Sequence, residues 1–198
     1  LVLAIAAVSG HSVTGAQDRM DVHGIKGHRD AVINGMTIDV KSASPYAFKK
    51  FKVGNLRNDD PFGYISQLSS YVYAAVDDPL VTDKTHGGFL VVCKVSGAVC
   101  LDVYDFSEEF DAKESTVKHL KAMAKSDEPP DRAFEPVPQS KASNNGNMKL
   151  ASTCGYCDFK KICYPKLRKF VYSDKPLYLT KVNKLPNVAE DLEFRGEI

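Results

Sequence analysis

The sequence predicts an α/β fold in which a mixed sheet with an antiparallel part is flanked by helices. Short apolar runs flank Asn34-Gly35 and Ser96-Gly97, and such dipeptides are typical of hairpin turns. Between the two hairpins, apolar residues recur at helical spacing after Asp60-Pro61. With 198 residues, 43% of them hydrophobic, the chain can form one main domain and an appended segment.

The dipeptide Asn34-Gly35 tolerates positive φ at both positions, which predicts a two-residue turn and therefore the register of the first hairpin. Counting outward from this turn places Ile33 opposite Met36 and, further along, Asp30 opposite Asp39. Directly opposite residues have Cβ atoms about 4.5–5.5 Å apart, where two negative charges are unfavourable unless something neutralises them. A divalent cation is the obvious neutraliser.

The same face of the hairpin carries a cation and a histidine. Because side chains alternate along a strand, Lys41 shares the face of Asp39, while His28 shares that of Asp30 and is expected across from Lys41. In the alternative interpretation, both aspartates point to solvent and Lys41 only balances their charge. The mostly apolar strands, and the position of both aspartates outside the turn, favour a functional face.

Asp60-Pro61 marks a helix start, with Asp as the N-cap and Pro at the first helical position. We expect this helix to run to about Asp77. Gln67 and Tyr71 lie one turn apart on it, beside the core stripe. Alone they would be ordinary surface residues, but next to the hairpin they become candidates for the site. The stripe itself consists of five apolar residues: Phe62, Ile65, Leu68, Val72 and Val76.

The other elements complete one core with an appended segment. At the start of the chain we expect the end of a core helix at residues 1–8, closed by Gly10. Strands at 12–22, 25–33 and 36–41 should form an antiparallel meander. We then expect a second hairpin at 88–95 and 98–106, with Cys93 opposite Cys100, and a helix from Ser107 to about Lys125. We expect the N-terminal part of the first helix to be truncated. Residues 1–128 thus form the core, 129–147 a linker or loop, and 148–198 a C-terminal cysteine-bearing lobe with a basic tail.

Charge is unevenly distributed, although the formal net charge is only +1. Residues 41–58 hold five Lys or Arg and no acid, whereas residues 141–184 hold ten against two acids. Basic surfaces attract phosphate backbones. In the first stretch, Lys49, Lys50 and Lys52 alternate with aromatic residues, which suits contacts with a single-stranded nucleic acid. Alternatively, the aromatic residues pack inward and the lysines are simply solvated.

Cys154, Cys157 and Cys163 lie in one short stretch, on a loop that is expected to enter a short helix. Three thiols at this spacing can converge on one soft metal centre. A tetrahedral zinc site or a four-cysteine iron–sulfur cluster needs a fourth ligand from elsewhere. A disulfide is the weaker interpretation, because pairing two of the thiols leaves one over. Cys93 and Cys100 are expected to be small core residues, with a metal role as the alternative.

Together these motifs resemble a known family. Gly27-x-x-Asp30, Asp39-Val40-Lys41-Ser42, Gln67-x-x-x-Tyr71 and the cysteine stretch resemble the RecB-like branch of the PD-(D/E)XK nucleases. The closest resemblance is to CRISPR-associated and bacteriophage exonucleases with a C-terminal iron–sulfur cluster, and it covers roughly residues 10–165. Each motif is short, but four of them in the right order are specific.

The resemblance implies a role for each matching residue of the hairpin. Asp30 and Asp39 would ligate Mg²⁺ or Mn²⁺, with the backbone carbonyl of Val40 as a further ligand. Lys41 would orient or activate the attacking water and stabilise charge on the phosphate. Hard oxygen ligands suit Mg²⁺, and a bound metal ion both supplies a nucleophile and neutralises developing charge.

The resemblance also implies roles outside the hairpin. Gln67 and Tyr71 would brace the active site and contact the DNA backbone. The three clustered cysteines would hold a 4Fe–4S cluster, with Zn²⁺ as the alternative, and this cluster would pin the C-terminal lobe rather than perform redox chemistry.

Two parts of the family pattern are not recognisable: a metal-binding His on a helix before the meander, and a fourth cluster Cys further upstream. We expect both to precede Leu1. If the chain is complete, His28 could partly replace the missing ligand, and Cys93 or Cys100 could complete the cluster. We expect His28 to lie beside the metal ligands rather than among them.

The function implied by the resemblance is a metal-dependent deoxyribonuclease, in the simplest case an exonuclease on single-stranded DNA ends in recombination, repair or phage DNA metabolism. A nicking or flap endonuclease, and a catalytically retired DNA-binding module, are the alternatives. The apolar stretch at residues 1–8 is too short to span a bilayer, so we expect no membrane partner. We expect the protein in the cytoplasm of a bacterial host, with a phage origin also open.

Overall fold

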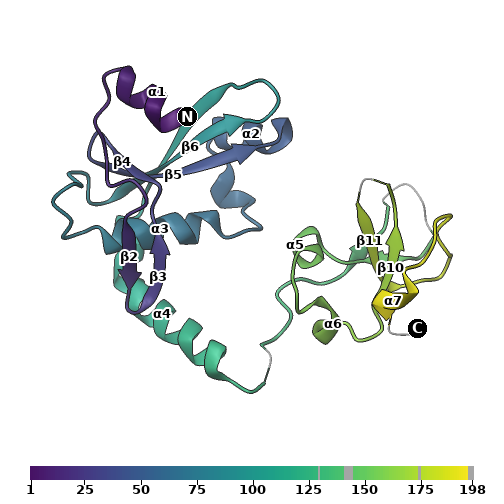
Figure 1. The fold of residues 1–198 in the computed structure, drawn as a ribbon. Helices are drawn as coiled ribbons and strands as arrows, with labels where there is room; N and C mark the ends of the chain where they lie inside the picture. The colour runs from purple at the N-terminus through teal and green to yellow at the C-terminus, as the bar shows by residue number, and fades with distance from the viewer. Residues whose placement is uncertain (129, 141–144, 174, 196–198) are drawn as a thin grey trace. The chain divides into compact units, whose positions relative to one another are not determined.

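The computed structural model describes residues 1–128, 130–140, 145–173 and 175–195 (Figure 1). The chain divides into two compact units, Leu1–Asp127 and Glu128–Ile198. Among the described residues, no helix is both long and apolar enough to cross a membrane.

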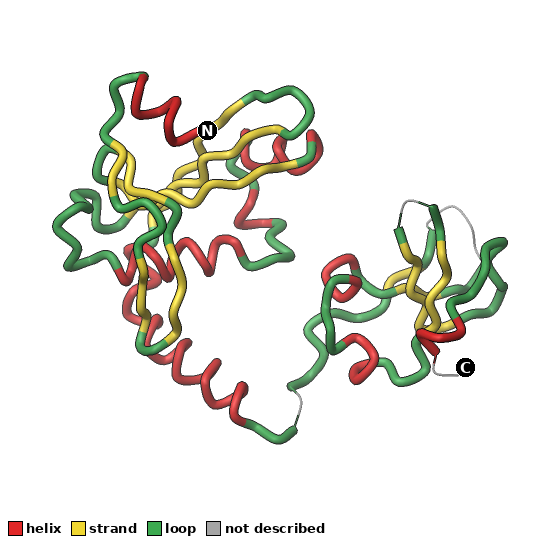
Figure 2. Tube along the Cα trace, in the orientation of Figure 1, coloured by secondary structure: helices red, strands yellow, loops and turns green. Residues whose placement is uncertain are grey.

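The first unit is built on a five-stranded sheet (Figure 2). In spatial order its strands are β1 (Val13–Thr14), β4 (Ala31–Ile33), β5 (Met36–Ala43), β6 (His86–Cys93) and β7 (Val99–Asp105). Strands β5 and β6 pair in parallel and the other neighbours pair antiparallel, so the predicted mixed sheet is confirmed. The remaining elements are α1 (Val2–Val8), β2 (Arg19–Val22), β3 (Ile25–His28), α2 (Pro45–Lys52), η1 (Leu56–Asn58), α3 (Tyr64–Ala74), η2 (Ser107–Glu109) and α4 (Phe110–Lys125).

Helices α2 and α3 pack against β5 and β6 and enclose the main core. Leu68 and Val72 of α3, Phe51 of α2 and Phe89 of β6 are all buried there. A Cβ on Gly87 would lie 2.6 Å from Val72 Cγ2, so α3 can approach the sheet this closely only because residue 87 is glycine. Because α3 packs this closely on β6, it also contacts the neighbouring strand β5.

The β4–β5 hairpin has the predicted register. Asn34 and Gly35 adopt φ values of 49° and 80°, and Ile33 pairs with Met36. The carbonyl of Gly35 accepts hydrogen bonds from the backbone N–H groups of Thr82 (2.9 Å) and Asp83 (3.1 Å). The turn is therefore held by the loop that follows α3.

The predicted three-stranded meander is wrong, because its first two strands each divide. β1 and β4 belong to the five-stranded sheet, whereas β2 and β3 form a separate two-stranded ribbon. Arg29 lies at the bend and is 1% exposed; its guanidinium is 2.8 Å from Asp18 Oδ2 and 2.6 Å from Asp78 Oδ2. A buried guanidinium needs such partners, and these are available only where the ribbon leaves the sheet.

The second hairpin forms, but its predicted register is wrong. Cys100 pairs with Val91, and the Cys93 N–H donates to the Ala98 carbonyl at 2.8 Å, so the two cysteines are not opposite each other. Of the expected turn dipeptide only Gly97 has positive φ, at 70°. Serine, unlike asparagine, does not readily take that conformation, so the turn is longer and the register shifts by two residues.

Two predicted helices differ from the structure. Helix α3 begins at Tyr64 rather than at Pro61, although the Asp60 carboxylate still caps it, accepting hydrogen bonds from the N–H groups of Tyr64 (3.0 Å) and Ile65 (2.8 Å). It ends at Ala74, and of its predicted stripe Phe62 (52%) and Val76 (41%) are exposed. Helix α1 forms and ends before Gly10 (φ 88°), but none of its residues is buried, so the prediction of a core helix is wrong.

The second unit contains a four-stranded sheet in the order β10 (Arg168–Val171), β11 (Pro176–Lys181), β9 (Met148–Lys149), β8 (Val137–Pro138). Three short helices accompany it: α5 (Ser152–Gly155), α6 (Lys160–Cys163) and α7 (Leu192–Arg195). β8 lies within the segment expected to be a linker. Asn147 is buried and joins two segments, because its Oδ1 accepts hydrogen bonds from the N–H groups of Asn183 (2.7 Å) and Lys184 (2.9 Å).

Candidate active site

Strand β5 presents an acid and a base on the same face, as predicted. Asp39 is 3% exposed, and its Oδ2 lies 2.6 Å from Lys41 Nζ. The two residues are separated by one position, so the alternation of the strand directs both side chains to the face that α3 covers. The interpretation in which Asp39 points to solvent is therefore wrong.

Asp30 lies immediately before β4 and reaches across to β5. Its Oδ2 accepts a hydrogen bond from the Val40 N–H at 2.7 Å, and its Oδ1 accepts one from Gln17 Nε2 at 2.9 Å. These two contacts hold the carboxylate beside Asp39, and its negative charge affects the pKa of Asp39. The predicted pair of neighbouring carboxylates is thus present in the structure.

Burial raises the pKa of Asp39, and the negative charge of Asp30 adds to this rise. The hydrogen bond and the positive charge of Lys41 act in the opposite direction, without cancelling the effect of burial. A buried carboxylate beside a second carboxylate is a group that benefits from a further positive charge. Lys41 therefore compensates the pair only in part.

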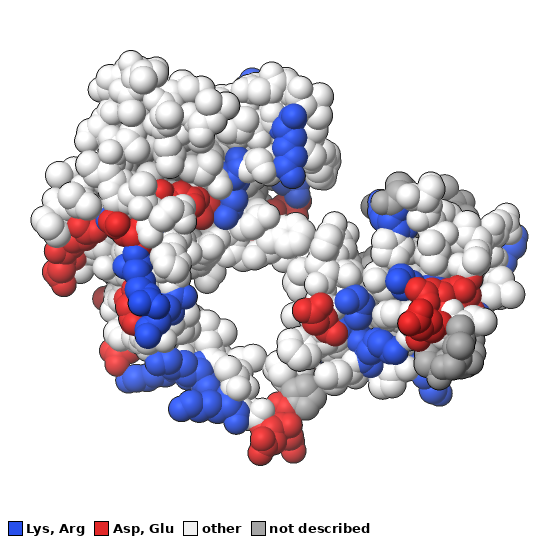
Figure 3. Space-filling model, viewed as in Figure 1, with Lys and Arg blue, Asp and Glu red and all other residues white. Residues whose placement is uncertain are grey.

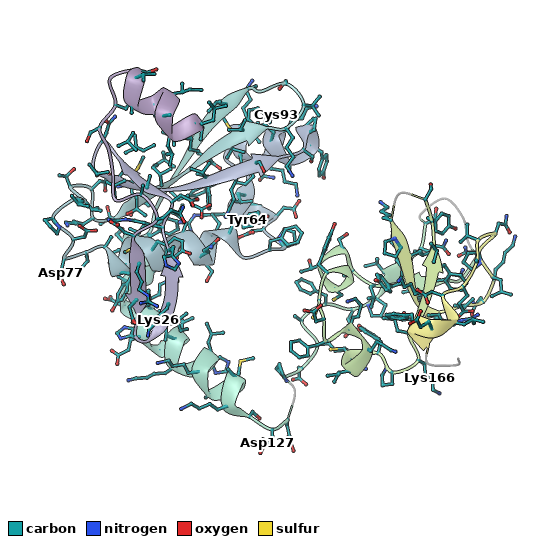
Figure 4. The ribbon with its side chains drawn as sticks, in the orientation of Figure 1. Lys26, Tyr64, Asp77, Cys93, Asp127 and Lys166 are labelled. Atoms are coloured by element: carbon teal, nitrogen blue, oxygen red, sulfur yellow. The ribbon has the colours of Figure 1, made fainter. Side chains whose placement is uncertain are left out.

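Helix α3 supplies the next members of the site. Lys41 Nζ donates a hydrogen bond to Gln67 Oε1 at 3.2 Å, and Gln67 Nε2 donates one to Tyr71 Oη at 3.2 Å. The same ammonium lies 4.7 Å from the ring centroid of Tyr64, which opens α3 and is labelled in Figure 4. Lys41 thus contacts both Asp39 on the sheet and side chains that lie along one face of α3.

Gly27 allows the ribbon to approach this helix. A Cβ at position 27 would lie 2.9 Å from both Cε1 and Oη of Tyr71, closer than a side chain tolerates. Gly27 has no positive φ, so its role is space rather than backbone conformation. The first residue of the Gly27-x-x-Asp30 motif therefore positions Tyr71, while the last contributes a carboxylate.

The donor set around Asp39 suits a small hard cation. Among the described residues, the buried Oδ2 of Asp39 has the Lys41 ammonium as its contact and no other hydrogen-bond donor. Within the described part of the chain, no three His, Cys, Asp or Glu side chains are grouped to hold a metal ion. Two carboxylates with a backbone carbonyl, completed by water and substrate phosphate, are a set that suits Mg²⁺ or Mn²⁺.

His28 does not lie where the sequence predicted. It pairs with Arg19 in the β2–β3 ribbon and is exposed, because the chain bends between it and Asp30. The prediction that it shares the face of Asp30 and lies across from Lys41 is wrong. The prediction assumed one continuous strand through residues 25–33.

The three predicted DNA-binding lysines lie on α2, where Lys and Arg side chains are visible in Figure 3. Lys49 and Lys52 are exposed, while Lys50 forms an ion pair with Asp59. The aromatic residues of this segment do not all pack inward, and they are not all exposed. Phe51 is buried and Phe48 is half-buried, whereas Tyr46 is 74% exposed, with Lys50 Nζ 5.3 Å from its ring centroid.

Cys154, Cys157 and Cys163 lie at and between α5 and α6 in the second unit, and all three are half-buried free thiols. Burial raises the pKa of Cys154, and the charges of Cys157 and Cys163 raise it further. The three sulfur atoms are thus near enough to interact, but among the described residues they do not form a metal-holding group. Cys93 and Cys100 lie on β6 and β7 of the first unit.

Three residues of the site are not among those predicted: Gln17, Arg29 and Tyr64. Tyr64 could have been found, because it precedes Gln67 by three residues and Tyr71 by seven and so shares their helix face. Gln17 and Arg29 act through partners distant in sequence, and no local pattern indicates them. Gln17 also donates its backbone N–H to the Asp30 carbonyl at 3.2 Å, so it holds that residue twice.

A comparison with protein families identifies the superfamily of the chain. The family model of the PD-(D/E)XK nuclease superfamily matches residues 3–164. The chain belongs to this superfamily. Its members generally use Mg²⁺ or Mn²⁺ to cleave nucleic acids, and this chain is accordingly a nuclease by family. Searches among curated proteins and among solved structures found no significant match.

Proposed function

We propose that this PD-(D/E)XK protein is a DNA exonuclease of the RecB-like branch that hydrolyses phosphodiester bonds at single-stranded ends with Mg²⁺ or Mn²⁺. The observation that carries the proposal is the buried Asp39 carboxylate 2.6 Å from Lys41 Nζ, with Asp30 held beside it. A protein that only bound DNA would gain nothing from a buried carboxylate with a second carboxylate beside it where a phosphate must approach, because like charges repel.

Asp30, Asp39 and the Val40 carbonyl would hold the metal ion. When bound, such an ion would lower the pKa of the attacking water and neutralise charge on the phosphate. Lys41 would donate to a phosphate oxygen or to the attacking water, since its ammonium has three N–H donors and only some are engaged by Asp39 and Gln67. A fixed positive charge of this kind stabilises the charge that develops in the transition state.

Gln67 and Tyr71 would act mainly by position. Gln67 fixes the Lys41 ammonium by accepting its hydrogen bond, and Tyr71 in turn accepts one from Gln67. On α2, the exposed Lys49, Lys52 and Tyr46 would contact the strand as it enters. Positive charge with an exposed aromatic ring supports binding of single-stranded rather than double-stranded DNA, because only unpaired bases offer a free face for stacking.

We also propose that Cys154, Cys157 and Cys163 bind a 4Fe–4S cluster, with Zn²⁺ as the alternative. The mutual influence of their thiols supports a shared ligand, although the described arrangement is not itself a metal-holding group. Brown protein that loses its colour in Cys157→Ser would support the cluster. Colourless protein that contains stoichiometric zinc would overturn it.

The nuclease proposal is tested with end-labelled linear single-stranded DNA in Mg²⁺, in Mn²⁺ and in EDTA. We expect shortening of the strand from an end with either metal ion, no reaction in EDTA, and loss of activity in Lys41→Ala. Unchanged cleavage by Lys41→Ala would overturn the proposed mechanism.

Two alternatives have distinct outcomes in the same assay. A nicking or flap endonuclease would cut circular single-stranded DNA or branched substrates, which an exonuclease leaves intact. A catalytically retired module would bind the strand without turnover under every metal condition. A location in the bacterial cytoplasm and a phage origin stay predictions of the resemblance.

A further inference from the structure

A cleft of about 200 Å³ lies in the first unit between the β2–β3 ribbon, α3 and α4. Gln67 and Tyr71 form part of its wall, and Gln67 is the residue that accepts the hydrogen bond from Lys41. The cleft therefore begins one side chain away from the proposed catalytic lysine. It is smaller than the roughly 300–1,000 Å³ pockets that hold drug-sized ligands, so it suits one small planar group.

Two sides of the cleft are apolar. Met20 and Val22 of β2 line one side and are nearly fully buried, and Val117 and Leu120 of α4 line another. Leu120 is 47% exposed, so its side chain lies where the cleft meets solvent. Apolar walls favour the faces of an uncharged ring and disfavour a phosphate, whose charge would lose its water there.

Two lysines also line the cleft, together with hydroxyl and amide side chains of α3 and α4. Lys26 is exposed, and Lys113 is the buried one of the two. Lys113 is only 7% exposed, and its ammonium donates a hydrogen bond to Ser69 Oγ at 2.7 Å. Ser69 is its one hydrogen-bond acceptor among the described residues, whereas an ammonium has three N–H groups to donate. Burial lowers the pKa of Lys113, as expected for an amine that is incompletely compensated by its surroundings. The cleft thus combines two apolar sides with a buried lysine in its lining.

We propose that this cleft binds a single unstacked nucleobase, that of the nucleotide next to the phosphate held at Asp39 and Lys41, with Lys113 donating to acceptor atoms on the edge of the base. This inference rests on the proposed nuclease function and adds the place of a base to it. Guanine fits best, because its O6 and N7 are adjacent acceptors that lysine recognises. A single-stranded end presents such a base without the cost of opening a base pair.

The test measures binding of short fluorescent single-stranded oligonucleotides by anisotropy in EDTA, so that it does not depend on cleavage. A single abasic site is moved one position at a time along the strand, and guanine and cytosine are exchanged at each position. For the wild-type chain we expect one position where the abasic site weakens binding by about 5- to 100-fold, the range measured for loss of one stacked base. At that position guanine should bind more tightly than cytosine.

Two variants examine the walls and the cation separately. Leu120→Ala should reduce the abasic penalty, and Lys113→Met should abolish the preference for guanine, while both bind the abasic strand as the wild type does. Lys118→Met is the matched control, because Lys118 lies on the exposed side of α4 in an ion pair with Glu114. It should retain the full penalty and the guanine preference.

The possible failures are distinguishable. The absence of an abasic penalty at every position would overturn the base cleft, even if the protein cleaves DNA. Equal weakening of base-containing and abasic strands by Lys113→Met would overturn it in favour of a phosphate contact. A base-dependent penalty without any metal-dependent cleavage would support the cleft and overturn the proposed nuclease function instead.

Discussion

Two aspartates in the same cross-strand row of the sheet differ in their surroundings. Asp39 of β5 and Asp102 of β7 both pair with Phe89 of the strand between them, and both are nearly fully buried. Each has a partner two residues further along its own strand. Asp39 has Lys41, and Asp102 accepts a hydrogen bond from Tyr104 Oη at 2.5 Å.

Burial raises the pKa of both carboxyl groups, so a perturbed pKa does not by itself distinguish a functional residue from a structural one. The difference lies in the surroundings. Asp39 has a second carboxylate beside it and an ammonium that continues to Gln67 on α3. Asp102 has a neutral phenol that donates a hydrogen bond to it, and no second carboxylate or ammonium is among the causes of its pKa shift. A metal site needs neighbouring carboxylates like those at Asp39, whereas a stable core tolerates a single carboxylate that is hydrogen-bonded like Asp102.

The largest effect should come from Asp39→Asn. Removing one charged ligand should lower metal-dependent cleavage by about 10³-fold or more, because the metal ion contributes several kcal/mol of transition-state stabilisation. Stabilisation of the fold by Mn²⁺, measured as a rise in melting temperature, should disappear with it. Asp102→Asn is the matched control and should retain cleavage. Similar losses in both variants would show that burial, and not the Asp30–Lys41 surroundings, is what matters.

Gly27→Ala should have the next largest effect. The added methyl group would meet the Tyr71 ring, displace Gln67 and so misplace Lys41, and misplacement of this kind can cost about 10²-fold in rate. The loss should be in kcat at saturating metal and substrate. Gly155→Ala is the control, because a Cβ there has no atom within 4 Å. An active Gly27→Ala would show that Tyr71 does not position the lysine.

Tyr104→Phe should reduce stability and leave activity unchanged. It removes the donor to the buried Asp102 carboxylate, and an unsatisfied buried acceptor costs about 1–3 kcal/mol. Urea unfolding measures the loss. Adding Asp102→Asn to the same chain should recover most of it, since the buried charge is then gone. A double variant no more stable than Tyr104→Phe would contradict this assignment.

The smallest effect concerns pH in EDTA. Because the folded pKa of Asp39 is raised above its unfolded value, the folded protein holds that proton more tightly. Stability should therefore fall as pH rises from the unfolded pKa of about 4 through the raised folded pKa. Asp39→Asn removes this penalty, so the difference in melting temperature, variant minus wild type, should increase with pH across that window. A constant difference would mean that Lys41 compensates Asp39 fully.

The sequence alone predicts those parts of the site that depend on residues close together in the chain. Asn34-Gly35 determines the register of the first hairpin, and with it the neighbourhood of Asp30, Asp39 and Lys41, because both turn residues accept positive φ. Helical spacing then gives Gln67 and Tyr71. These are the residues on which the proposed site depends.

The sequence alone does not predict those features that depend on contacts between segments far apart in the chain. The bend at Arg29 depends on Asp18 and Asp78, which come from a loop before it and a loop after α3. That bend places His28 opposite Arg19 in the ribbon instead of across from Lys41, and it divides two predicted strands. The register of the second hairpin differs from the predicted one for a local reason, because Ser96 does not take the positive φ that Asn34 takes in the first turn.

The two hairpin turns also differ in how they would accept an inserted label. A Cβ on Gly35 would lie 2.0 Å from Thr82 Oγ1, whereas a Cβ on Gly97 would have no atom within 4 Å. A peptide tag or spectroscopic probe placed at Asn34-Gly35 would push against the loop after α3 and disturb the strand that carries Asp39. The turn at Ser96-Gly97 is the better place to attach one when the protein is immobilised or followed by fluorescence.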